Sequence, residues 1–257
     1  MTCHVFIHGV PDTPYMWTPL IEALGLEDHE IETPALPGFT GPVPNGFPST
    51  KEAYADWLIR RCETIRERTG KPMHLVGHDW GAILALRIAS LRPDLFETWC
   101  VSNALIDSQY AGHRMAKIWA TPIAGELLMA VTRRDALAKS LAQQGLPEDM
   151  ARHEAANWSP HMRRAILRLY RSARGLRFSK HWEDDLETLP DRGLVFWGET
   201  DPYVGLDVAE RFRKRWGYPL EVAPGAGHWA IVERADHLAS LLKSHWAGAP
   251  ASSEPDL

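Results

Sequence analysis

Short apolar runs alternate with amphipathic segments along most of the chain. Each apolar run ends in a turn rich in glycine or proline, and most segments that follow carry apolar residues at helical spacing. Such alternation is typical of a parallel sheet whose strands are joined by crossover helices. Strands are expected at residues 3–7, 30–33, 73–76, 96–101, 193–197 and 220–222, and helices at 17–26, 49–68, 82–91 and 231–246. The pattern predicts an α/β fold with a mostly parallel sheet of about six strands.

The alternation stops in the middle of the chain. From about residue 106 to 182 the pattern contains helical segments only, with breaks at 121–122, 145–147 and 159–160. A helical block between two strands of a parallel sheet is most simply an inserted cap. We therefore expect a core domain formed by residues 1–105 and 184–257 and a helical cap domain formed by residues 106–183.

Composition and charge narrow the classes of function. A chain of 257 residues with 45% hydrophobic content can bury a large core. The net charge of −5 gives no basic field for a polyanion, which argues against a nucleic-acid partner. Three scattered cysteines fit a reducing compartment better than a disulfide framework. With no apolar span long enough for a bilayer and no signal-like start, we expect a cytoplasmic protein without a membrane partner.

Tryptophan is abundant for a chain of this length. Eleven are present, and several lie in the middle third. Core packing explains most of them, but their supply favours an aromatic-lined pocket for a small lipophilic substrate.

The segment Gly77-His78-Asp79-Trp80-Gly81 joins an expected strand directly to an expected helix. A strand, a turn with glycines four residues apart and a helix form the nucleophile elbow of α/β-hydrolases, here with aspartate where serine is commoner. An aspartate nucleophile forms an ester intermediate. The alternative is that Asp79 only caps the helix, as aspartate often does.

Two more polar residues follow expected strands. Asp201 comes after the strand at 193–197, and His228 comes after the strand at 220–222. The order nucleophile, acid, histidine is that of the α/β-hydrolase triad. Asp201 alone could form a turn before Pro202, and His228 alone could be an ordinary loop histidine. Together with Asp79 they favour a triad, and the Val10 N–H after the first strand is a candidate oxyanion donor.

These motifs carry a resemblance to a known family. The segments 8–11, 77–81, 198–202 and 227–229 are together similar to the epoxide hydrolase and haloalkane dehalogenase branch of the α/β-hydrolase superfamily. The resemblance implies that Asp79 attacks a substrate carbon and that His228 then activates water against the ester. It implies that Asp201 orients His228, and that the N–H groups of Val10 and Trp80 bind the oxyanion. The scheme needs water but no metal or organic cofactor.

The helical block supplies the expected substrate contacts. The segment 166–171 resembles the family's second-tyrosine segment, which makes Tyr170 the candidate proton donor for epoxide opening. The first tyrosine has no match, because its position falls near Met115. His113 is close enough to replace it, and Tyr110 is a more distant option. The residues expected to line the substrate pocket are Trp80, Trp119 and Pro11.

A dehalogenase needs donors that hold a halide. Trp80 offers one N–H group, but the asparagine that often supplies the second is replaced by Val10. A cap tryptophan, Trp119 or Trp158, could complete such a site. The sequence therefore favours an epoxide hydrolase, with a haloalkane dehalogenase as the alternative. Another ester- or lactone-type hydrolase, or a non-catalytic binding protein, is the further alternative.

Both ends of the chain carry expectations of their own. Family members usually have two strands before the one that ends at His8, so the sheet is either shorter here or lacks N-terminal strands. An edge left uncovered in this way could pair two copies into a homodimer. The small, polar tail from Ala247 to Leu257 is expected to be mobile.

Overall fold

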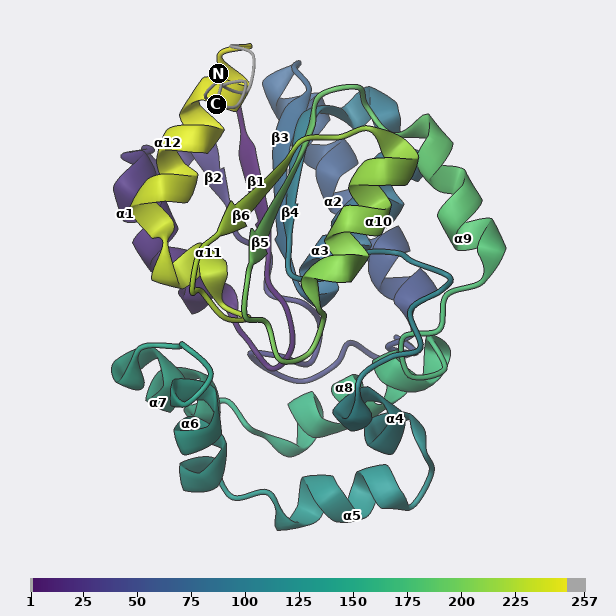
Figure 1. Cartoon of the computed structure of the whole chain (residues 1–257). Coiled ribbons are helices and arrows are strands. Elements are labelled where there is room, and N and C mark those ends of the chain that lie inside the picture. Colours follow the sequence, from purple (N-terminus) through teal and green to yellow (C-terminus); the bar gives the residue numbers. More distant parts are fainter. Residues whose placement is uncertain (1, 249–257) are drawn as a thin grey trace.

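A six-stranded parallel sheet forms the centre of the computed structural model, which describes residues 2–248 (Figure 1). Its order is β2-β1-β3-β4-β5-β6, and every neighbouring pair is parallel. The strands are β1 (His4–Ile7), β2 (Ile31–Glu32), β3 (Met73–His78), β4 (Phe96–Ser102), β5 (Gly193–Gly198) and β6 (Leu220–Ala223). The predicted parallel α/β sheet is confirmed. The expected tail lies mostly outside the described residues.

Each central strand sends alternate side chains to opposite faces of the sheet. Phe6, Val76 and Phe196 pack in one buried cluster. Their neighbours Leu75 and Val195 pack in the other. Because successive strand residues point to opposite faces, a continuous apolar run is what a strand covered on both sides requires. The two-residue β2 is the exception: it lies at the sheet edge, half-exposed, and is shorter than expected.

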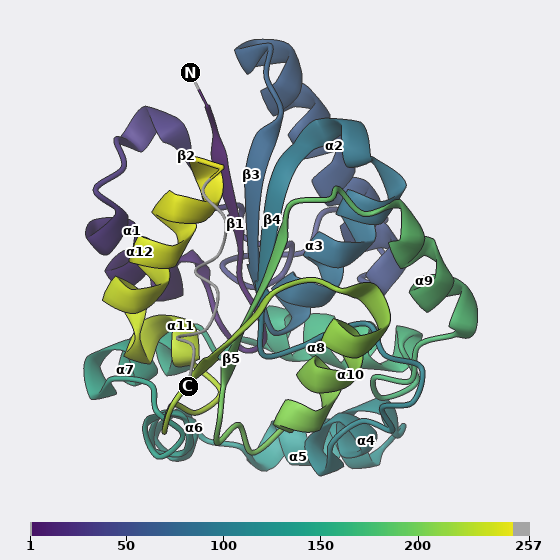
Figure 2. The same ribbon diagram turned by 45° about the horizontal axis from the view of Figure 1, so that its top comes forward.

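Helices cover both faces of the sheet (Figures 1 and 2). On one face lie α1 (Thr18–Leu24), α11 (Ala230–Glu233) and α12 (Ala235–Trp246). On the other lie α2 (Lys51–Thr69), α3 (Trp80–Leu91) and α10 (Leu206–Trp216).

The expected helix at 231–246 is wrong in one respect. Arg234, with φ −128° and ψ 40°, separates α11 from α12. The expected helix at 17–26 is shorter, because Gly25 at φ 63° ends α1.

The described segment between β4 and β5 consists of helices and loops and contains no strand. It contains α4 (Arg114–Ala120), α5 (Ala124–Val131), α6 (Arg134–Ala142), α7 (Glu148–Ala156), α8 (Pro160–Ser172) and α9 (Lys180–Asp184). Figure 1 places α4 to α8 across the carboxyl ends of the strands. Helix α9 lies instead beside the sheet, where Trp182 packs against Arg87 of α3. The strand ends therefore face α4 to α8.

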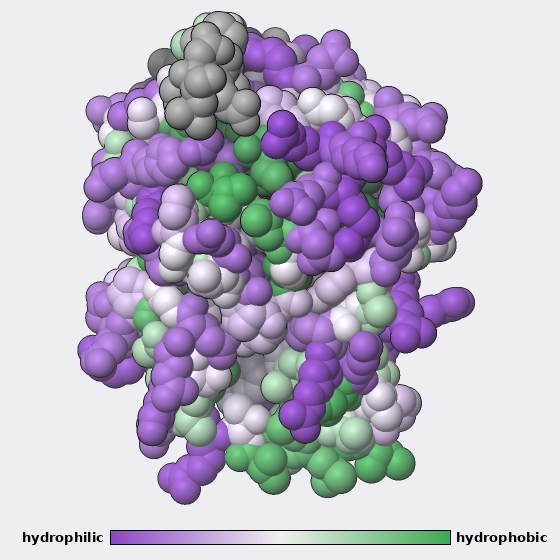
Figure 3. Space-filling model, viewed as in Figure 1, coloured by the Kyte–Doolittle hydropathy of each residue, from purple (hydrophilic) through white to green (hydrophobic). Residues whose placement is uncertain are grey.

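The surface of α5 is unusually apolar. Ile123, Leu127 and Val131 are 62–74% exposed and recur every fourth residue. Figure 3 shows this apolar edge at the bottom of the molecule. Among the described residues, no helix is both long and apolar enough to cross a membrane.

Candidate active site

The turn between β3 and α3 holds Asp79 in a conformation that few residues adopt. Its φ is 51° and its ψ is −124°. A Cβ on Gly77 would lie 2.5 Å from the carbonyl oxygen of Gly81, and one on Gly81 would overlap the carbonyl oxygen of Ile7. Only glycine allows β1, β3 and α3 to approach this closely. The sequence pattern thus produces the sharp elbow that presents Asp79 at the edge of the sheet.

The carboxylate of Asp79 is held by backbone amides. Its Oδ1 accepts a hydrogen bond from the Val10 N–H at 2.8 Å, and the Trp80 N–H also bonds the carboxylate. Although Asp79 occupies the N-cap position of α3, its side chain does not form the usual capping hydrogen bond. No capping hydrogen bond therefore supports the interpretation of Asp79 as a simple helix cap.

The loop that carries Val10 is itself fixed by His8. The buried His8 ring bonds the Gly9 carbonyl through Nδ1 at 2.9 Å, and its Nε2 accepts the Leu36 N–H at 3.0 Å. Burial lowers the pKa of His8 to about 4, so the ring is neutral, as these two bonds require. His8 therefore orients the amide that faces Asp79.

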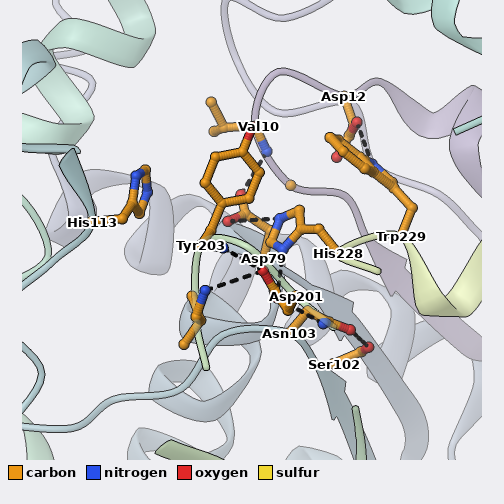
Figure 4. A network of polar contacts seen from close by, with 12 residues as sticks. Val10, Asp12, Asp79, Ser102, Asn103, His113, Asp201, Tyr203, His228 and Trp229 are labelled. Atoms are coloured by element: carbon orange, nitrogen blue, oxygen red, sulfur yellow. Dashed lines mark hydrogen bonds and ion pairs between the residues drawn. The ribbon is translucent and has the colours of Figure 1, made fainter. Parts of the chain in front are cut away.

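The structure brings Asp79, Asp201 and His228 together (Figure 4). His228 Nδ1 lies 2.8 Å from Asp201 Oδ2, and its Nε2 lies 3.7 Å from Asp79 Oδ2. The bond to Asp201 places a proton on Nδ1 and directs Nε2 toward Asp79. All three side chains are buried.

Asp201 is fixed by several donors. Its Oδ1 accepts the N–H groups of Tyr203 at 2.7 Å and Val204 at 3.1 Å. Its Oδ2 accepts the side-chain amide of Asn103 at 2.8 Å as well as His228. These bonds fix the carboxylate plane, and with it the direction of the imidazole.

Burial and neighbouring charges shift the pKa values of all three residues. Burial raises the pKa of Asp79, against the opposing effect of His228 and the backbone amides. Burial alone would lower the pKa of His228, but Asp201, Asp79 and Asp12 raise it to about 9. Burial would raise the pKa of Asp201, yet His228 and the hydrogen bonds keep it below its usual value. His228 is thus a cation stabilised by the carboxylates around it.

Asn103 is a site residue that the sequence reasoning missed. It follows β4 at the same sheet edge, and its φ of 58° lies in a region that asparagine tolerates better than most residues. Its Oδ1 accepts the Ser102 hydroxyl at 2.6 Å, which orients the amide toward Asp201. Its place after a strand was the available signal.

A cavity of about 370 Å³ opens over Asp79 and His228. Pro11 and Trp119 line it, as expected. Trp80 does not, because its fully buried indole packs edge-on against Tyr170 at 5.3 Å. The remaining lining is mainly apolar and comes largely from the helical segment: Met115, Leu128, Val131, Thr132, Ala136, Leu137, Ser140, Leu141 and Trp158.

Two polar side chains of the helical segment, Tyr170 and His113, line this cavity. Tyr170 is buried there, and burial followed by the charge of Asp79 raises the pKa of its hydroxyl well above the usual value. His113 caps α4, with Nδ1 accepting the Ala116 N–H at 3.2 Å. Burial lowers the pKa of His113 to about 4, so the ring is neutral and carries its proton on Nε2. The Tyr170 hydroxyl can donate a proton, and the neutral His113 ring can donate a hydrogen bond from Nε2.

The other residues of the helical segment that were weighed from the sequence are placed differently. The Tyr110 hydroxyl donates to the Tyr203 carbonyl at 2.7 Å, and Tyr110 does not line the cavity. Trp158 lines the cavity, but its Nε1 donates to the Thr132 carbonyl at 3.2 Å. Tyr203, which the sequence reasoning missed, lines the cavity with its ring 4.9 Å from that of His228.

Known proteins resemble the chain over most of its length. Residues 5–240 match the alpha/beta hydrolase family. The AB hydrolase superfamily protein YfhM of Bacillus subtilis (strain 168) is 25% identical over 91% of this chain and 82% of its own length. Epoxide hydrolase 3 of Xenopus tropicalis is 24% identical, covering 93% of this chain and 70% of that protein. A haloalkane dehalogenase of Bradyrhizobium diazoefficiens is 24% identical, covering 96% and 87%.

A solved structure supports the same fold. The 2-hydroxy-6-oxo-6-phenylhexa-2,4-dienoate hydrolase from Rhodococcus sp. strain RHA1 matches with a TM-score of 0.77 at 21% identity, covering 96% of this chain and 91% of that chain. At this identity the likeness concerns the fold alone. The family match across 5–240, together with the parallel sheet and its elbow, shows that the chain belongs to the alpha/beta hydrolase family.

Proposed function

We propose that this hydrolase converts a lipophilic epoxide to a vicinal diol through an ester on Asp79. One observation carries the proposal. Asp79 Oδ1 lies against the Val10 N–H, while Oδ2 faces His228 in a cavity that Tyr170 and His113 also line. One carboxylate oxygen is thus available for attack, and proton donors face the same space.

In the first step, Asp79 Oδ2 attacks an epoxide carbon. A carbon–oxygen bond to Asp79 forms as the ring carbon–oxygen bond breaks, and the ring oxygen takes the proton of Tyr170. The raised pKa of Tyr170 keeps this hydroxyl protonated before the reaction. His113, neutral and protonated on Nε2, can donate a hydrogen bond to the same oxygen without transferring its proton. The helical segment α4 to α8 then acts as the cap that supplies these groups.

In the second step, His228 acts as the base. Ester formation removes the negative charge of Asp79, one of the charges that raise the pKa of His228, so the imidazolium becomes more acidic. Once its Nε2 has lost its proton to solvent, it accepts a proton from water. The resulting hydroxide attacks the ester carbonyl carbon.

The backbone amides stabilise the second step. Oδ1 of Asp79 becomes the carbonyl oxygen of the ester and develops negative charge as hydroxide attacks. The Val10 and Trp80 N–H groups already bond this carboxylate. A single donor of this kind is worth on the order of 10²–10³ in rate. Collapse of the intermediate breaks the ester bond, and the leaving alkoxide takes the proton that His228 Nε2 received from water, which completes the diol. One water oxygen stays on Asp79, whose carboxyl proton passes to solvent, and Tyr170 and His228 each regain a proton from solvent.

Dehalogenation is the second candidate, since one curated relative is a haloalkane dehalogenase. A halide site would use Trp80 Nε1, which has no acceptor among the described residues, but the fully buried Trp80 does not line the cavity. A second donor is harder to find, because Val10 has no polar side chain and the Trp158 N–H bonds the Thr132 carbonyl. The hydroxyl of Tyr170 and the ring of His113 suit an alkoxide better, which ranks the epoxide first.

An ester or lactone hydrolase and a binding protein fit less well. An ester hydrolase has no need of a proton donor opposite a carboxylate nucleophile. A binding protein has no need of a histidine fixed 2.8 Å from one carboxylate and 3.7 Å from another.

The test is a panel of aryl and alkyl epoxides and matching bromoalkanes, with diol and halide measured in parallel. We expect diol formation to exceed halide release, and both to disappear in Asp79→Asn. Halide release with no diol would replace the proposal by its alternative. Full turnover by Asp79→Asn would remove Asp79 as the nucleophile.

A further inference from the structure

A second pair of buried carboxyl groups lies beside the triad. Asp12 belongs to the loop after β1, and Glu154 belongs to α7. Both residues are fully buried. Asp12 Oδ1 accepts the Trp229 Nε1–H at 3.1 Å, and Glu154 Oε1 accepts the Thr13 hydroxyl at 3.1 Å. Figure 4 shows Asp12 and Trp229 next to His228. The pair therefore joins α7 to the loop that carries the histidine.

Each of these carboxyl groups has one unsatisfied oxygen. Asp12 Oδ2 and Glu154 Oε2 are buried and have no hydrogen-bond partner among the residues that the structure describes. Within that part of the chain, neither group forms an ion pair with lysine or arginine. A buried, unpaired carboxylate is strongly unfavourable, and a second one next to it is more so.

The titratable groups around the pair do not neutralise it. The negative charge of Asp79 raises the pKa of Asp12, and the positive charge of His228 lowers it. Tyr203 lies in the loop before α10, and the charge of Asp12 contributes to the raised pKa of its hydroxyl. The charged group that acts most on Glu154 is Asp12 itself. One cation, His228, thus faces three carboxylates of the core: Asp79, Asp201 and Asp12.

We propose that Glu154 is protonated in the folded protein, and that Glu154 and Asp12 together position α7 against the catalytic loop. A proton on Glu154 turns one unsatisfied acceptor into a donor and removes one of the two buried charges. Helix α7 packs on α6, whose Leu137, Ser140 and Leu141 line the cavity. The pair thus acts on the substrate cavity through packing, and on His228 through Trp229.

The pKa values agree with this assignment. Burial, and then the charge of Asp12, raise the pKa of Glu154 to about 9. Burial, and then the charge of Asp79, raise the pKa of Asp12 to about 7. The proton that is retained as the pH rises above 7 therefore resides on Glu154. This inference concerns a proton site and does not depend on which substrate the enzyme hydrolyses.

A protonated Glu154 makes stability depend on pH with a definite sign. The folded protein keeps this proton up to a pH of about 9, whereas an unfolded chain releases it near 4.5. The folded state binds more protons in this window, so the free energy of unfolding falls as the pH rises through it. Glu154→Gln copies the protonated carboxyl and removes this contribution.

The experiment measures the melting temperature of the full chain from pH 6 to pH 9. The wild type is compared with Glu154→Gln and with Glu148→Gln, an exposed glutamate on the same helix. We expect the melting temperature of Glu154→Gln to rise relative to that of the wild type by about 2 °C or more between pH 6 and pH 9. Glu148→Gln should follow the wild-type slope. A Glu154→Gln protein that is less stable by the same amount at every pH would overturn the proposal.

An infrared titration of the wild type keeps the test independent of folding in the variant. A protonated carboxyl group absorbs at a higher C=O stretching frequency than a carboxylate. We expect a band of the protonated form at pH 7 that disappears as the pH passes about 9. If no protonated carboxyl is present at pH 7, the proposal is wrong. Because neither readout uses activity, failure here is distinguishable from failure of the proposed reaction.

Discussion

Replacing His228 by glutamine separates the two steps of the proposed reaction. Attack by Asp79 Oδ2 does not require a base, whereas hydrolysis of the ester does. Glutamine keeps a hydrogen-bond donor for Asp201, now 2.8 Å from His228 Nδ1, but cannot accept a proton from water. Loss of a general base costs about 10²–10⁴ in rate. Steady turnover should fall by that factor while the first ester forms at close to its normal rate.

The assay is rapid mixing followed by intact-protein and peptide mass spectrometry. We expect one equivalent of adduct on the peptide that contains Asp79, and none in the double variant Asp79→Ala/His228→Gln. An epoxide adds its whole mass, whereas a bromoalkane adds its mass less that of HBr, so the adduct also identifies the chemistry. His181→Gln, at an exposed histidine of α9, is the control and should turn over normally. Normal turnover by His228→Gln without an adduct would refute the base role.

The same assay gives a pH dependence. His228 has a pKa of about 9 while Asp79 is charged. Esterification removes that charge, so the pKa of His228 in the ester should lie below 9, and ester hydrolysis should slow as the pH falls through it. Single-turnover hydrolysis measured from pH 5 to pH 10 checks the midpoint. A midpoint at or above 9 would contradict the coupling between Asp79 and His228.

Three further substitutions follow from the geometry. Tyr170→Phe should slow epoxide opening by about 10²–10⁴ in single-turnover assays but spare bromoalkanes, and equal effects on both would exclude Tyr170 as the proton donor. Asn103→Gly keeps the positive φ but removes one hydrogen-bond donor from Asp201. The activation free energy that kcat reports should rise by about 1–3 kcal/mol, with little change in KM. Unchanged steady-state kinetics would count against that role. Gly81→Ala should prevent folding, because its Cβ would overlap the Ile7 carbonyl, whereas Gly41→Ala meets open space and should melt like the wild type; a normally folded Gly81→Ala, by circular dichroism, would show that the elbow can relax.

Much of the fold is predictable from local pattern. Strands covered on both faces give short apolar runs, so β1, β3, β4 and β5 are visible in the sequence, whereas the half-exposed β2 is blurred at its ends. The position of the site also follows from pattern, since parallel strands bring their carboxyl ends to one edge. Asp79, Asp201 and His228 meet for that reason.

Residues that depend on tertiary packing are not visible in the same way. Asn103 reaches Asp201 only because β4 and β5 are neighbours, and no spacing rule joins residues 98 positions apart. Glu154 is an ordinary polar position of an amphipathic helix until α7 packs over Thr13. Trp80 was expected in the pocket because it follows Asp79, but the turn into α3 buries its indole behind Tyr170.

The central claim is that an ester forms on Asp79, and isotope transfer tests it most directly. Hydroxide from water attacks the ester carbonyl, so each turnover in ¹⁸O-labelled water leaves one solvent oxygen on the Asp79 carboxylate. After many turnovers, the peptide that contains Asp79 should gain mass from ¹⁸O, and enzyme incubated without substrate should not. Product formation with no label in that peptide would contradict the ester and, with it, the proposed mechanism.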